Sequence, residues 1–316
     1  MQIGALLNPK DMTVRLALAI LPLYFRYFPI LWGKRFIWKK IVMRRLIWRR
    51  LTLTTRSFFG ARFEVQFPDI VQTCLYFFGV WEPAITRYLL DRLAEGDIFI
   101  DVGANIGYYT LLASRCVGAS GRVFAIEAAS RTHSTLQRNI LQNNAGNVTA
   151  FHLAVSDAPG QVPVWLNEEG DLAGTTTLSH VGERRRALTL VETVEARVLE
   201  QIVDAQIIRK ARFIKIDVEG AEWAVIKSLA ELVKTVSSQT EFIVEINGGL
   251  VRRSGGTIEA LIGYFAAAGF EPFVIENRYD ADFLARKVRS VELQPLGAWT
   301  ANQLDLVFRR NASSTT

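Results

Sequence analysis

The sequence predicts an α/β fold in which a doubly wound, parallel sheet carries helices on both faces. Three observations lead to this prediction. Short apolar runs typical of buried strands recur along the chain, helix-length patterns separate most of them, and nearly every run ends at polar, mostly acidic, residues. The runs cover residues 98–102, 123–126, 148–155, 213–218 and 242–246.

The N-terminal end of the chain is strongly basic, whereas the rest is mildly acidic. Residues 1–60 hold 12 Lys and Arg side chains and one acid, and the remaining 256 residues hold 25 basic and 30 acidic side chains. Such asymmetry indicates that an N-terminal arm contacts an anionic surface. We divide the chain into a basic, aromatic-rich extension, residues 1–75, a main domain, residues 76–310, and a polar tail, residues 311–316.

The first apolar segment, residues 14–33, is too short and too interrupted to span a bilayer. Two arginines lie within it, and two prolines would break a straight helix. Its longest uncharged run, residues 16–25, is about half the ~20 residues that a bilayer requires. No small-residue cleavage site follows, so we do not expect a secretory signal either.

Residues 34–51 combine aromatic and basic side chains. Basic pairs recur every five residues, which spreads the charges around a helix. Seven of the ten apolar residues fall within one half of the helix circumference, with Trp38, Val42 and Leu46 outside it. We therefore expect residues 14–51 to suit an anionic membrane surface. The alternative is a helical subdomain packed on the main domain, and nucleic acid is a distant third partner because the body is acidic.

Helix-length patterns accompany the predicted strands of the main domain. Residues 82–96 place apolar side chains at helical spacing and end at Gly96, which suits a C-terminal cap. Further helices are expected over residues 132–143 and 221–233.

A glycine turn follows the first predicted strand. Asp101 stands at the end of that strand, and Gly103 and Gly107 lead through the turn into a helix. Glycine turns at helix N-termini commonly hold phosphate, but the carboxylate of Asp101 would repel a pyrophosphate. The dinucleotide pattern G-x-G-x-x-G is also absent, because Asn105 stands where its second glycine would be.

The polar residues at the strand ends favour a ligand that offers hydroxyl groups and a cation. Ligands of open α/β sheets bind beyond the carboxyl ends of the strands. Glu127 lies 20 residues after Gly107, at the place from which an acid accepts hydrogen bonds from ribose hydroxyls. Asp101 can accept a hydrogen bond from an ammonium group. Ribose and ammonium without phosphate together indicate S-adenosylmethionine.

Five blocks of the sequence resemble the FkbM-type S-adenosylmethionine-dependent methyltransferases. The blocks are DVGANIGYYT at 101–110, VFAIEAAS at 123–130, LAVSD at 153–157, FIKIDVEGAE at 213–222 and FIVEIN at 242–247. The resemblance covers about residues 76–310 and leaves out the basic arm. It implies a seven-stranded, mostly parallel sheet of the class I, Rossmann-like kind with an antiparallel last strand, built from EPFVIE and LDLVFRR. It also implies methyl transfer to oxygen, often on a sugar, a glycolipid or another small hydroxylated molecule.

The resemblance implies roles for individual residues. Those on the methionine side of the cofactor pocket are Asp101, Gly103, Asn105 and Gly107, and Tyr109 of the same block is counted among the cofactor-binding residues. Glu127 corresponds to the ribose clamp, and Ser156 with Asp157 to the adenine edge. Asp217 and Glu219 correspond to the motif beside the transferred methyl group.

Methyl transfer to a hydroxyl usually needs a base for the departing proton. The candidates are Asp217 and Glu219, with Glu245 across the rim and Lys215 as a charge partner. Acids so close together can raise the pKa of one of them, or can bind a divalent cation, although we assign no metal ligands from the sequence. The alternative is that Asp217 only shapes the pocket and Glu219 caps the next helix. His180 is the one histidine worth testing as a base.

Residues 159–193, between the third and fourth predicted strands, are polar and rich in Gly and Thr. A stretch of this length without a clear period predicts a long loop, which commonly covers an active site. We expect it to form part of the acceptor wall, with residues 175–179 able to hydrogen-bond a sugar.

Two other functions remain open at this point. A nicotinamide-dependent oxidoreductase is disfavoured by Asp101 and by the missing glycine pattern. A non-catalytic, membrane-associated module on the same fold is disfavoured by the intact row of acids. The two cysteines, Cys74 and Cys116, are too few for a disulfide framework and fit a reducing compartment. We therefore expect a cytoplasmic protein, peripheral on the inner face of a membrane.

Overall fold

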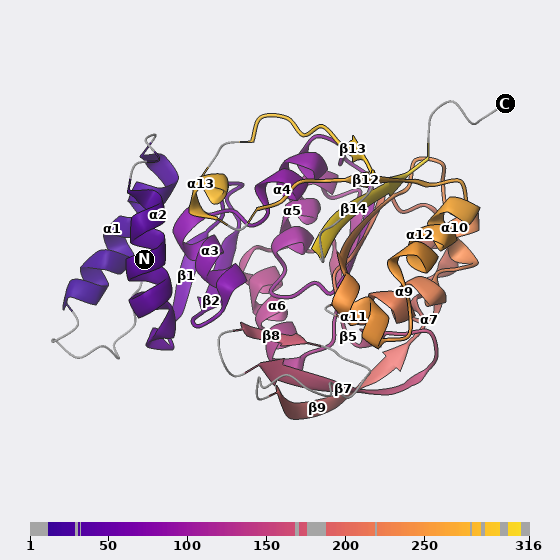
Figure 1. Ribbon diagram of the computed structural model, residues 1–316, viewed down its shortest axis with the longest axis horizontal. Coiled ribbons are helices and arrows are strands. Elements are labelled where there is room, and N and C mark those ends of the chain that lie inside the picture. Colours follow the sequence, from indigo (N-terminus) through magenta and orange to yellow (C-terminus); the bar gives the residue numbers. More distant parts are fainter. Residues whose placement is uncertain are drawn as a thin grey trace.

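A large central sheet with helices on both faces forms the body of the protein, and an N-terminal layer of helices and a hairpin lies against one end (Figure 1). The computed structural model describes residues 12–28, 31, 33–167, 171–175, 188–218, 220–278, 280–285, 288–297 and 303–310.

The elements follow one another along the chain in three groups. The N-terminal layer contains α1 (Met12–Tyr27), α2 (Lys34–Ile37), η2 (Trp38–Leu46), η3 (Ile47–Arg49), β1 (Thr52–Arg56), β2 (Arg62–Gln66) and α3 (Ile70–Phe78). The helices of the body are α4 (Pro83–Leu90), α5 (Tyr108–Val117), α6 (Ser130–Gln142), α7 (Leu199–Ile202), α8 (Ala205–Arg209), α9 (Glu222–Ser228), α10 (Leu232–Thr235), α11 (Gly248–Arg253), α12 (Ile258–Ala267) and α13 (Ala281–Leu284). Its strands are β3 (Ile98–Val102), β4 (Arg122–Glu127), β5 (Val148–His152), β6 (Ala154–Val155), β7 (Gly160–Asn167), β8 (Asp171–Thr175), β9 (Leu188–Arg197), β10 (Phe213–Ile216), β11 (Glu241–Asn247), β12 (Glu271–Val274), β13 (Gln294–Pro295) and β14 (Gln303–Arg309).

The central sheet has the strand order β13-β12-β14-β11-β10-β3-β4-β5. From β11 to β5 neighbouring strands are parallel, whereas β14 runs antiparallel to both β11 and β12. This confirms the predicted mostly parallel sheet of seven strands with its last strand antiparallel. The two-residue strand β13 adds an eighth member at the edge that the sequence did not predict.

Most residues of the inner strands of the sheet are apolar because both faces are covered. Phe99 of β3 and Phe213 of β10 belong to the core that α4 and α5 cover. Ile100 and Ile214, the next residues along, belong to the core that α9 and α12 cover. Side chains of a strand alternate between its two faces, so each strand contributes to two cores.

The region after β5 differs from the prediction. One strand was predicted over residues 148–155, but β5 and β6 belong to different sheets. A loop was predicted over residues 159–193, but β7, β8 and β9 join β6 in a second sheet with the order β6-β9-β7-β8. Val162 and Val164 are buried there at alternate positions, as in a strand. The high Gly and Thr content of the segment led to the prediction of a loop despite this alternation. Residues 176–179 of the predicted sugar contact lie outside the described residues.

Two predicted helices are shorter than expected. α4 ends at Leu90 rather than at Gly96, because the chain turns there toward β3 and Gly96, with φ 88°, lies in that turn. The helix predicted over residues 221–233 is divided into α9 and α10. The hydroxyl of Ser228 donates a hydrogen bond to the carbonyl oxygen of Val225 (2.6 Å), which competes with helical bonding at the break.

Two basic side chains, Arg26 and Lys34, join helices within the N-terminal layer. The guanidinium of Arg26 donates hydrogen bonds to carbonyl oxygens in the last turn of α3, those of Tyr76 and, at 3.3 Å, Phe77, where the helix itself leaves carbonyl groups without partners. The ammonium of Lys34 likewise donates a hydrogen bond at the end of α1, to the carbonyl oxygen of Phe25 (2.9 Å).

α3 runs across the predicted division between residues 75 and 76. The division of the chain at this point stays a prediction.

Part of the segment over residues 34–51 packs against the rest of the protein. The buried side chains include Trp38, Val42 and Leu46, which fell outside the predicted apolar half. Residues four apart share a face in an α-helix and in the π-helix η2 alike, so these three side chains enter the core together, where Trp38 packs against Phe25 and Phe77. Of the four basic pairs, only Lys34 is buried. Within the described part of the chain, no helix has the length and apolar character needed to cross a bilayer.

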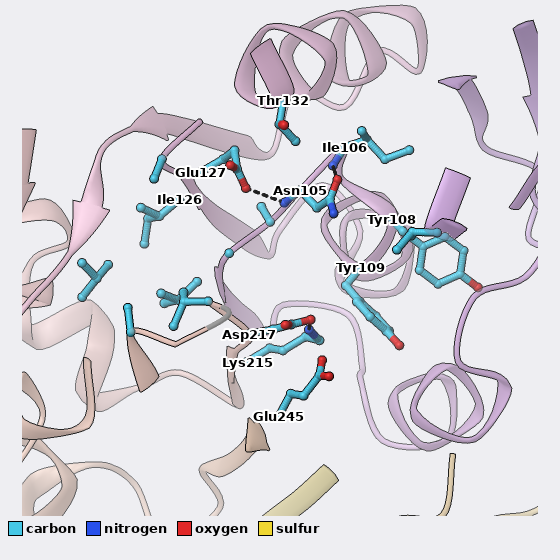
Figure 2. Close-up of a pocket in the computed structure, with 18 of the residues that line it drawn as sticks. Asn105, Ile106, Tyr108, Tyr109, Ile126, Glu127, Thr132, Lys215, Asp217 and Glu245 are labelled. Carbon is cyan, nitrogen blue, oxygen red and sulfur yellow. Dashed lines mark hydrogen bonds and ion pairs between the residues drawn. The ribbon is translucent and has the colours of Figure 1, made fainter. Parts of the chain in front are cut away.

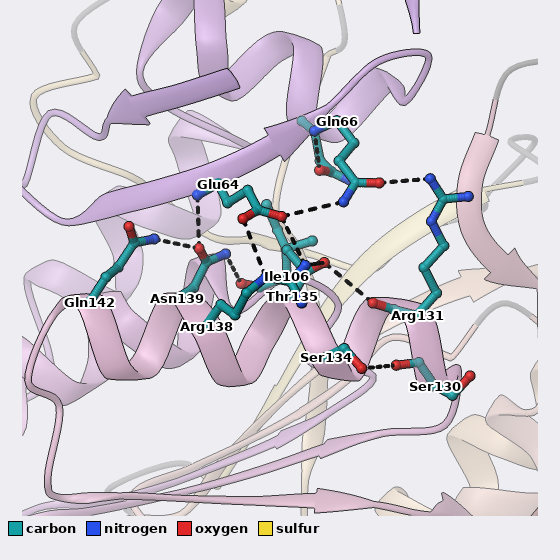
Figure 3. Close-up of polar contacts among 11 residues, drawn as sticks. Glu64, Gln66, Ile106, Ser130, Arg131, Ser134, Thr135, Arg138, Asn139 and Gln142 are labelled. Carbon is teal, nitrogen blue, oxygen red and sulfur yellow. Dashed lines mark hydrogen bonds and ion pairs between the residues drawn. The ribbon is translucent and has the colours of Figure 1, made fainter. Parts of the chain in front are cut away.

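A buried amide connects the β1–β2 hairpin to the body (Figure 3). The side chain of Asn139 in α6 is fully buried, accepts a hydrogen bond from the backbone N–H of Glu64 (2.8 Å) and donates one to the carbonyl oxygen of Ile106 (2.8 Å). Arg138 forms an ion pair with Glu64 beside it (2.8 Å). Because Ile106 belongs to the glycine turn after β3, one side chain joins the N-terminal layer to that turn.

We predict that Asn139→Leu lowers the free energy of unfolding by about 3 kcal/mol, because two buried backbone groups lose their partners. Equilibrium unfolding in urea measures this change. Ser134→Ala, on the exposed side of the same helix, is the control and should stay within about 0.5 kcal/mol of the original protein. Equal stability of the Leu variant and the original protein would contradict the role of Asn139.

Candidate active site

A cavity of about 300 Å³ lies at the carboxyl edge of the central sheet (Figure 2). The ends of β3, β4, β10 and β11 border it, together with the first turn of α3 and the start of α5. Its size lies at the lower end of the range for small-molecule sites. Seven of the residues that the sequence nominates line it, namely Gly103, Asn105, Tyr109, Glu127, Lys215, Asp217 and Glu245.

The turn between β3 and α5 requires glycine where it meets β10. Gly103 has φ 85°, and a Cβ atom on it would lie 1.7 Å from the carbonyl oxygen of Asp217. Asn105 also takes the left-handed conformation, at φ 50°, which asparagine adopts more readily than most residues. Gly107, with φ 90°, precedes α5 and is not among the lining residues. The absence of a side chain at Gly103 lets the two strand ends share one cavity.

Glu127 occupies the cavity wall at the end of β4. Its Oε2 accepts a hydrogen bond from the backbone N–H of Asn105 (2.8 Å), and its Oε1 accepts one from that of Ala129 (2.9 Å). Burial raises the pKa of Glu127 to about 7, although these two hydrogen bonds oppose the rise. Each carboxylate oxygen has a second lone pair, so Glu127 can still accept hydrogen bonds from the hydroxyls of a ligand.

Asp101 lies at the end of β3 and is 1% exposed, so it does not itself line the cavity. Its Oδ2 accepts a hydrogen bond from the hydroxyl of Thr110 (2.6 Å), whereas its Oδ1 has no partner among the described residues. Burial raises the pKa of Asp101, and the ammonium of Lys215 opposes this rise. A buried oxygen without a donor suits a ligand that brings N–H groups.

Lys215 is the cation at the centre of this group of acids. Its Nζ donates a hydrogen bond to Oδ2 of Asp217 (2.6 Å) and lies 4.8 Å from the centre of the Tyr109 ring. Burial by itself would lower the pKa of Lys215, but the carboxylates of Asp217, Glu82 and Asp101 outweigh burial and raise it. Lys215 therefore stays charged at neutral pH and holds Asp217 in place.

The structure adds two buried acids that the sequence did not nominate. Glu82 precedes α4 and is 2% exposed, and Asp305 lies within β14 and is 7% exposed. The strand register places Asp305 opposite Glu245 of β11. Repulsion from Asp217 and then burial raise the pKa of Glu245, and burial raises that of Asp305. An acid inside the apolar run LDLVF was the signal for Asp305, whereas Glu82 gave no comparable signal.

Two nominated residues fall elsewhere, and two more are not described. Ser156 and Asp157, predicted for the adenine edge, follow β6 and do not line the cavity, although both residues of β6 do. The carboxylate of Asp157 instead pairs with Lys227 of α9, whose hydrogen bond lowers the pKa of Asp157. Glu219 and His180 lie outside the described residues.

Taken together, the site offers hydrogen-bond acceptors and negative charge, with apolar walls from α3 and β6. Hydroxyl groups and cations find partners in such a cavity, whereas a phosphate would meet like charge.

Comparison with known proteins finds two family models that match parts of this chain. The model of the FkbM methyltransferase domain matches residues 101–272, and that of protein-L-isoaspartate(D-aspartate) O-methyltransferase matches residues 42–159. The hexuronic acid methyltransferase AglP of Haloferax volcanii is 27% identical over 194 residues, which are 61% of this chain and 73% of that protein. Methyltransferase 1 of Beauveria bassiana is 26% identical over 148 residues, 43% of this chain and 59% of that protein.

Solved structures show a more distant likeness. An S-adenosylmethionine-dependent O-methyltransferase from Thermotoga maritima is 13% identical, with a TM-score of 0.37 over 83% of this chain and 79% of that one. TYW2 of M. jannaschii, solved with AdoMet, is also 13% identical, with a TM-score of 0.38 over 83% of this chain and 88% of that one.

We predict that Gly103→Ala destabilises the fold by at least about 3 kcal/mol, because it adds left-handed strain to a clash with the main chain of Asp217. Thermal unfolding followed by circular dichroism measures the effect. Gly146→Ala is the matched control, since a Cβ atom there meets nothing within 4 Å, and it should change stability by at most about 1 kcal/mol. Similar melting temperatures for the two variants would refute the close approach at Gly103.

Proposed function

Because the chain belongs to the FkbM methyltransferase family, we propose a specific reaction for it, methylation of a hydroxyl oxygen on a sugar, a glycolipid or another small molecule. The chain is an S-adenosylmethionine-dependent methyltransferase. The acid-lined cavity carries the finer proposal, since carboxylates bind and deprotonate hydroxyl groups. A relative named for the methylation of hexuronic acid supports a sugar as the acceptor. We do not propose a nicotinamide-dependent reaction, because the family is one of methyltransferases.

The residues around the cavity fit S-adenosylmethionine. We assign Glu127 to the ribose hydroxyls and the turn over residues 103–107 to the methionine side. We assign Asp101, whose Oδ1 has no partner among the described residues, to the ammonium group, directly or through water. When bound, S-adenosylmethionine supplies an electrophilic methyl group.

Asp217 is our candidate for the base that removes the hydroxyl proton. It lines the cavity, its side chain is 24% exposed, and Lys215 holds its Oδ2 at 2.6 Å. Glu245 is less suited, because it lies opposite Asp305 and its Oε1 already accepts a hydrogen bond from the Gln303 amide. Lys215 therefore acts as a positioning residue that orients the base.

We predict that Asp217→Asn lowers kcat by about 10²–10⁴-fold, because the amide cannot take up the proton. The assay follows methyl transfer from labelled S-adenosylmethionine to glycans that contain hexuronic acid, and NMR identifies the methylated atom. A methyl group on a sugar oxygen is the expected product. Methylation at nitrogen or carbon, or an Asn variant with full kcat, would contradict the proposal.

Glu127→Gln is the matched control for this assay. The amide keeps one acceptor oxygen but loses the charge, so this variant should raise KM for S-adenosylmethionine with a smaller change in kcat. The two variants together separate cofactor binding from proton removal.

We further propose that the N-terminal layer rests on an anionic membrane surface. α1 exposes an apolar stripe of five residues, each 50–74% exposed: Met12, Leu16, Ile20, Leu23 and Tyr27. Their spacing of three or four residues places them on one side of the helix, while buried residues such as Leu18 and Phe25 belong to the shared core. Exposed apolar surface of this extent commonly marks an interaction site.

Basic side chains accompany the stripe. The exposed ones in α2 and η2 are Arg35, Lys39, Lys40, Arg44 and Arg45. Each basic residue near an anionic lipid surface contributes about 1 kcal/mol to binding. The acidic body would be repelled by the same surface, so the charge distribution favours contact through the N-terminal layer. Such contact would bring the enzyme to a glycolipid acceptor.

We predict that Leu16→Glu combined with Leu23→Glu abolishes flotation of the full chain with vesicles of phosphatidylserine and phosphatidylcholine. Both side chains are more than half exposed, so the fold should persist. Leu141→Glu, which changes an exposed side chain of α6, is the control and should float like the original protein. An original protein that stays in the dense fraction would refute membrane contact, and a floating double variant would refute the stripe.

A further inference from the structure

We propose that Glu82, Glu245 and Asp305 bind one divalent cation, Mg²⁺, Mn²⁺ or Ca²⁺, at the wall of the cavity. One carboxylate oxygen of each residue lies within 4.8 Å of those of the other two. Two ligands of one cation with bonds of about 2.1–2.5 Å stand at most about 5 Å apart, so this separation suits a shared ion.

Three separate elements bring these carboxylates together. Glu82 precedes α4, Glu245 lies in β11, and Asp305 lies in β14. The antiparallel register of β11 and β14 places Glu245 and Asp305 directly opposite each other. Like charges in that arrangement repel, and nothing in the alternation of the strands requires acids at either position. A cation between them would turn the repulsion into attraction.

Buried oxygens without a donor give an independent sign of a missing ligand. Oδ1 of Asp305 is buried and has no hydrogen-bond partner among the described residues, and the whole residue is 7% exposed. Oδ1 of Asn277 is also buried and has no hydrogen-bond partner among the described residues. The side-chain N–H of Asn277 donates a hydrogen bond to Oδ2 of Asp305 (2.9 Å). Buried polar atoms of native proteins are nearly always satisfied, so two neighbouring exceptions indicate a bound ion or its water ligands.

Neutral donors orient each of the three carboxylates. The Tyr109 hydroxyl donates to Oε2 of Glu82 (2.6 Å). Glu245 Oε1 accepts a hydrogen bond from the Gln303 amide, as Asp305 Oδ2 does from that of Asn277. Hydrogen-bond partners of this kind orient the carboxylate ligands of metal sites.

The ligand type and the surrounding charge select the cation. All three ligands are carboxylates, which prefer hard cations over zinc or copper. Asp217 and Asp101 add further negative charge nearby, against which Lys215 supplies one positive charge. Because Glu245 also lines the cavity, the cation would stand at its wall, where open coordination positions can take oxygen ligands of an acceptor.

The test is binding of Mn²⁺ to the full chain after dialysis against a chelator, with neither S-adenosylmethionine nor acceptor present. The electron paramagnetic resonance signal of free Mn²⁺ reports uptake. We expect one site per chain, weakened about 10–100-fold in Asp305→Asn and in Glu245→Gln. Glu259→Gln, which removes an exposed carboxylate, should bind like the original protein.

Thermal unfolding gives a second readout that does not depend on activity. Mn²⁺ should raise Tm of the original protein and of Glu259→Gln, and should leave that of Asp305→Asn unchanged. No uptake by the original protein would show that the three acids hold protons instead and would overturn the proposal. Uptake that is equal in all variants would place the ion elsewhere and would also overturn it. Neither result would affect the assignment as a methyltransferase.

Discussion

A buried imbalance of charge at the carboxyl edge of the sheet governs the site. Five carboxyl groups act on one another or on the ammonium of Lys215, namely those of Glu82, Asp101, Asp217, Glu245 and Asp305. The topology gathers most of them, because parallel strands end at a common edge and β14 enters antiparallel beside β11. Burial makes their repulsion costly, so the cavity favours ligands that bring positive charge or hydrogen-bond donors.

The N-terminal layer supports the same site from the other side. Ile70 and Val71 of α3 line the cavity, and Arg26 of α1 hydrogen-bonds the carbonyl groups at the far end of that helix. Apolar residues of the layer share one core with the body, including Phe77 and Phe99. The segment that we propose for membrane contact is thus continuous in structure with a wall of the cavity.

Much of this arrangement could be predicted because strands buried on both faces appear in the sequence as runs of consecutive apolar residues. β3 coincides with the predicted residues 98–102, and Glu127 was found because it ends the next strand. Asp305 was missed, since it lies inside a strand and reaches the site only through its register with β11. Burial of Trp38 could not be predicted from the apolar half of its helix, because Trp38 lies outside that half and is buried by contact with Phe25 and Phe77 from other helices. The second sheet was missed where Gly and Thr residues hid the alternation of its strands.

The central claim is that the acid-lined cavity takes a sulfonium nucleoside without phosphate groups. Calorimetric titration of the full chain with S-adenosylmethionine, and separately with NAD⁺, tests it most directly. We expect one site per chain for S-adenosylmethionine, lost or weakened in Glu127→Gln, and no binding of NAD⁺. Binding of NAD⁺ that matches that of S-adenosylmethionine, or no binding of S-adenosylmethionine, would contradict it.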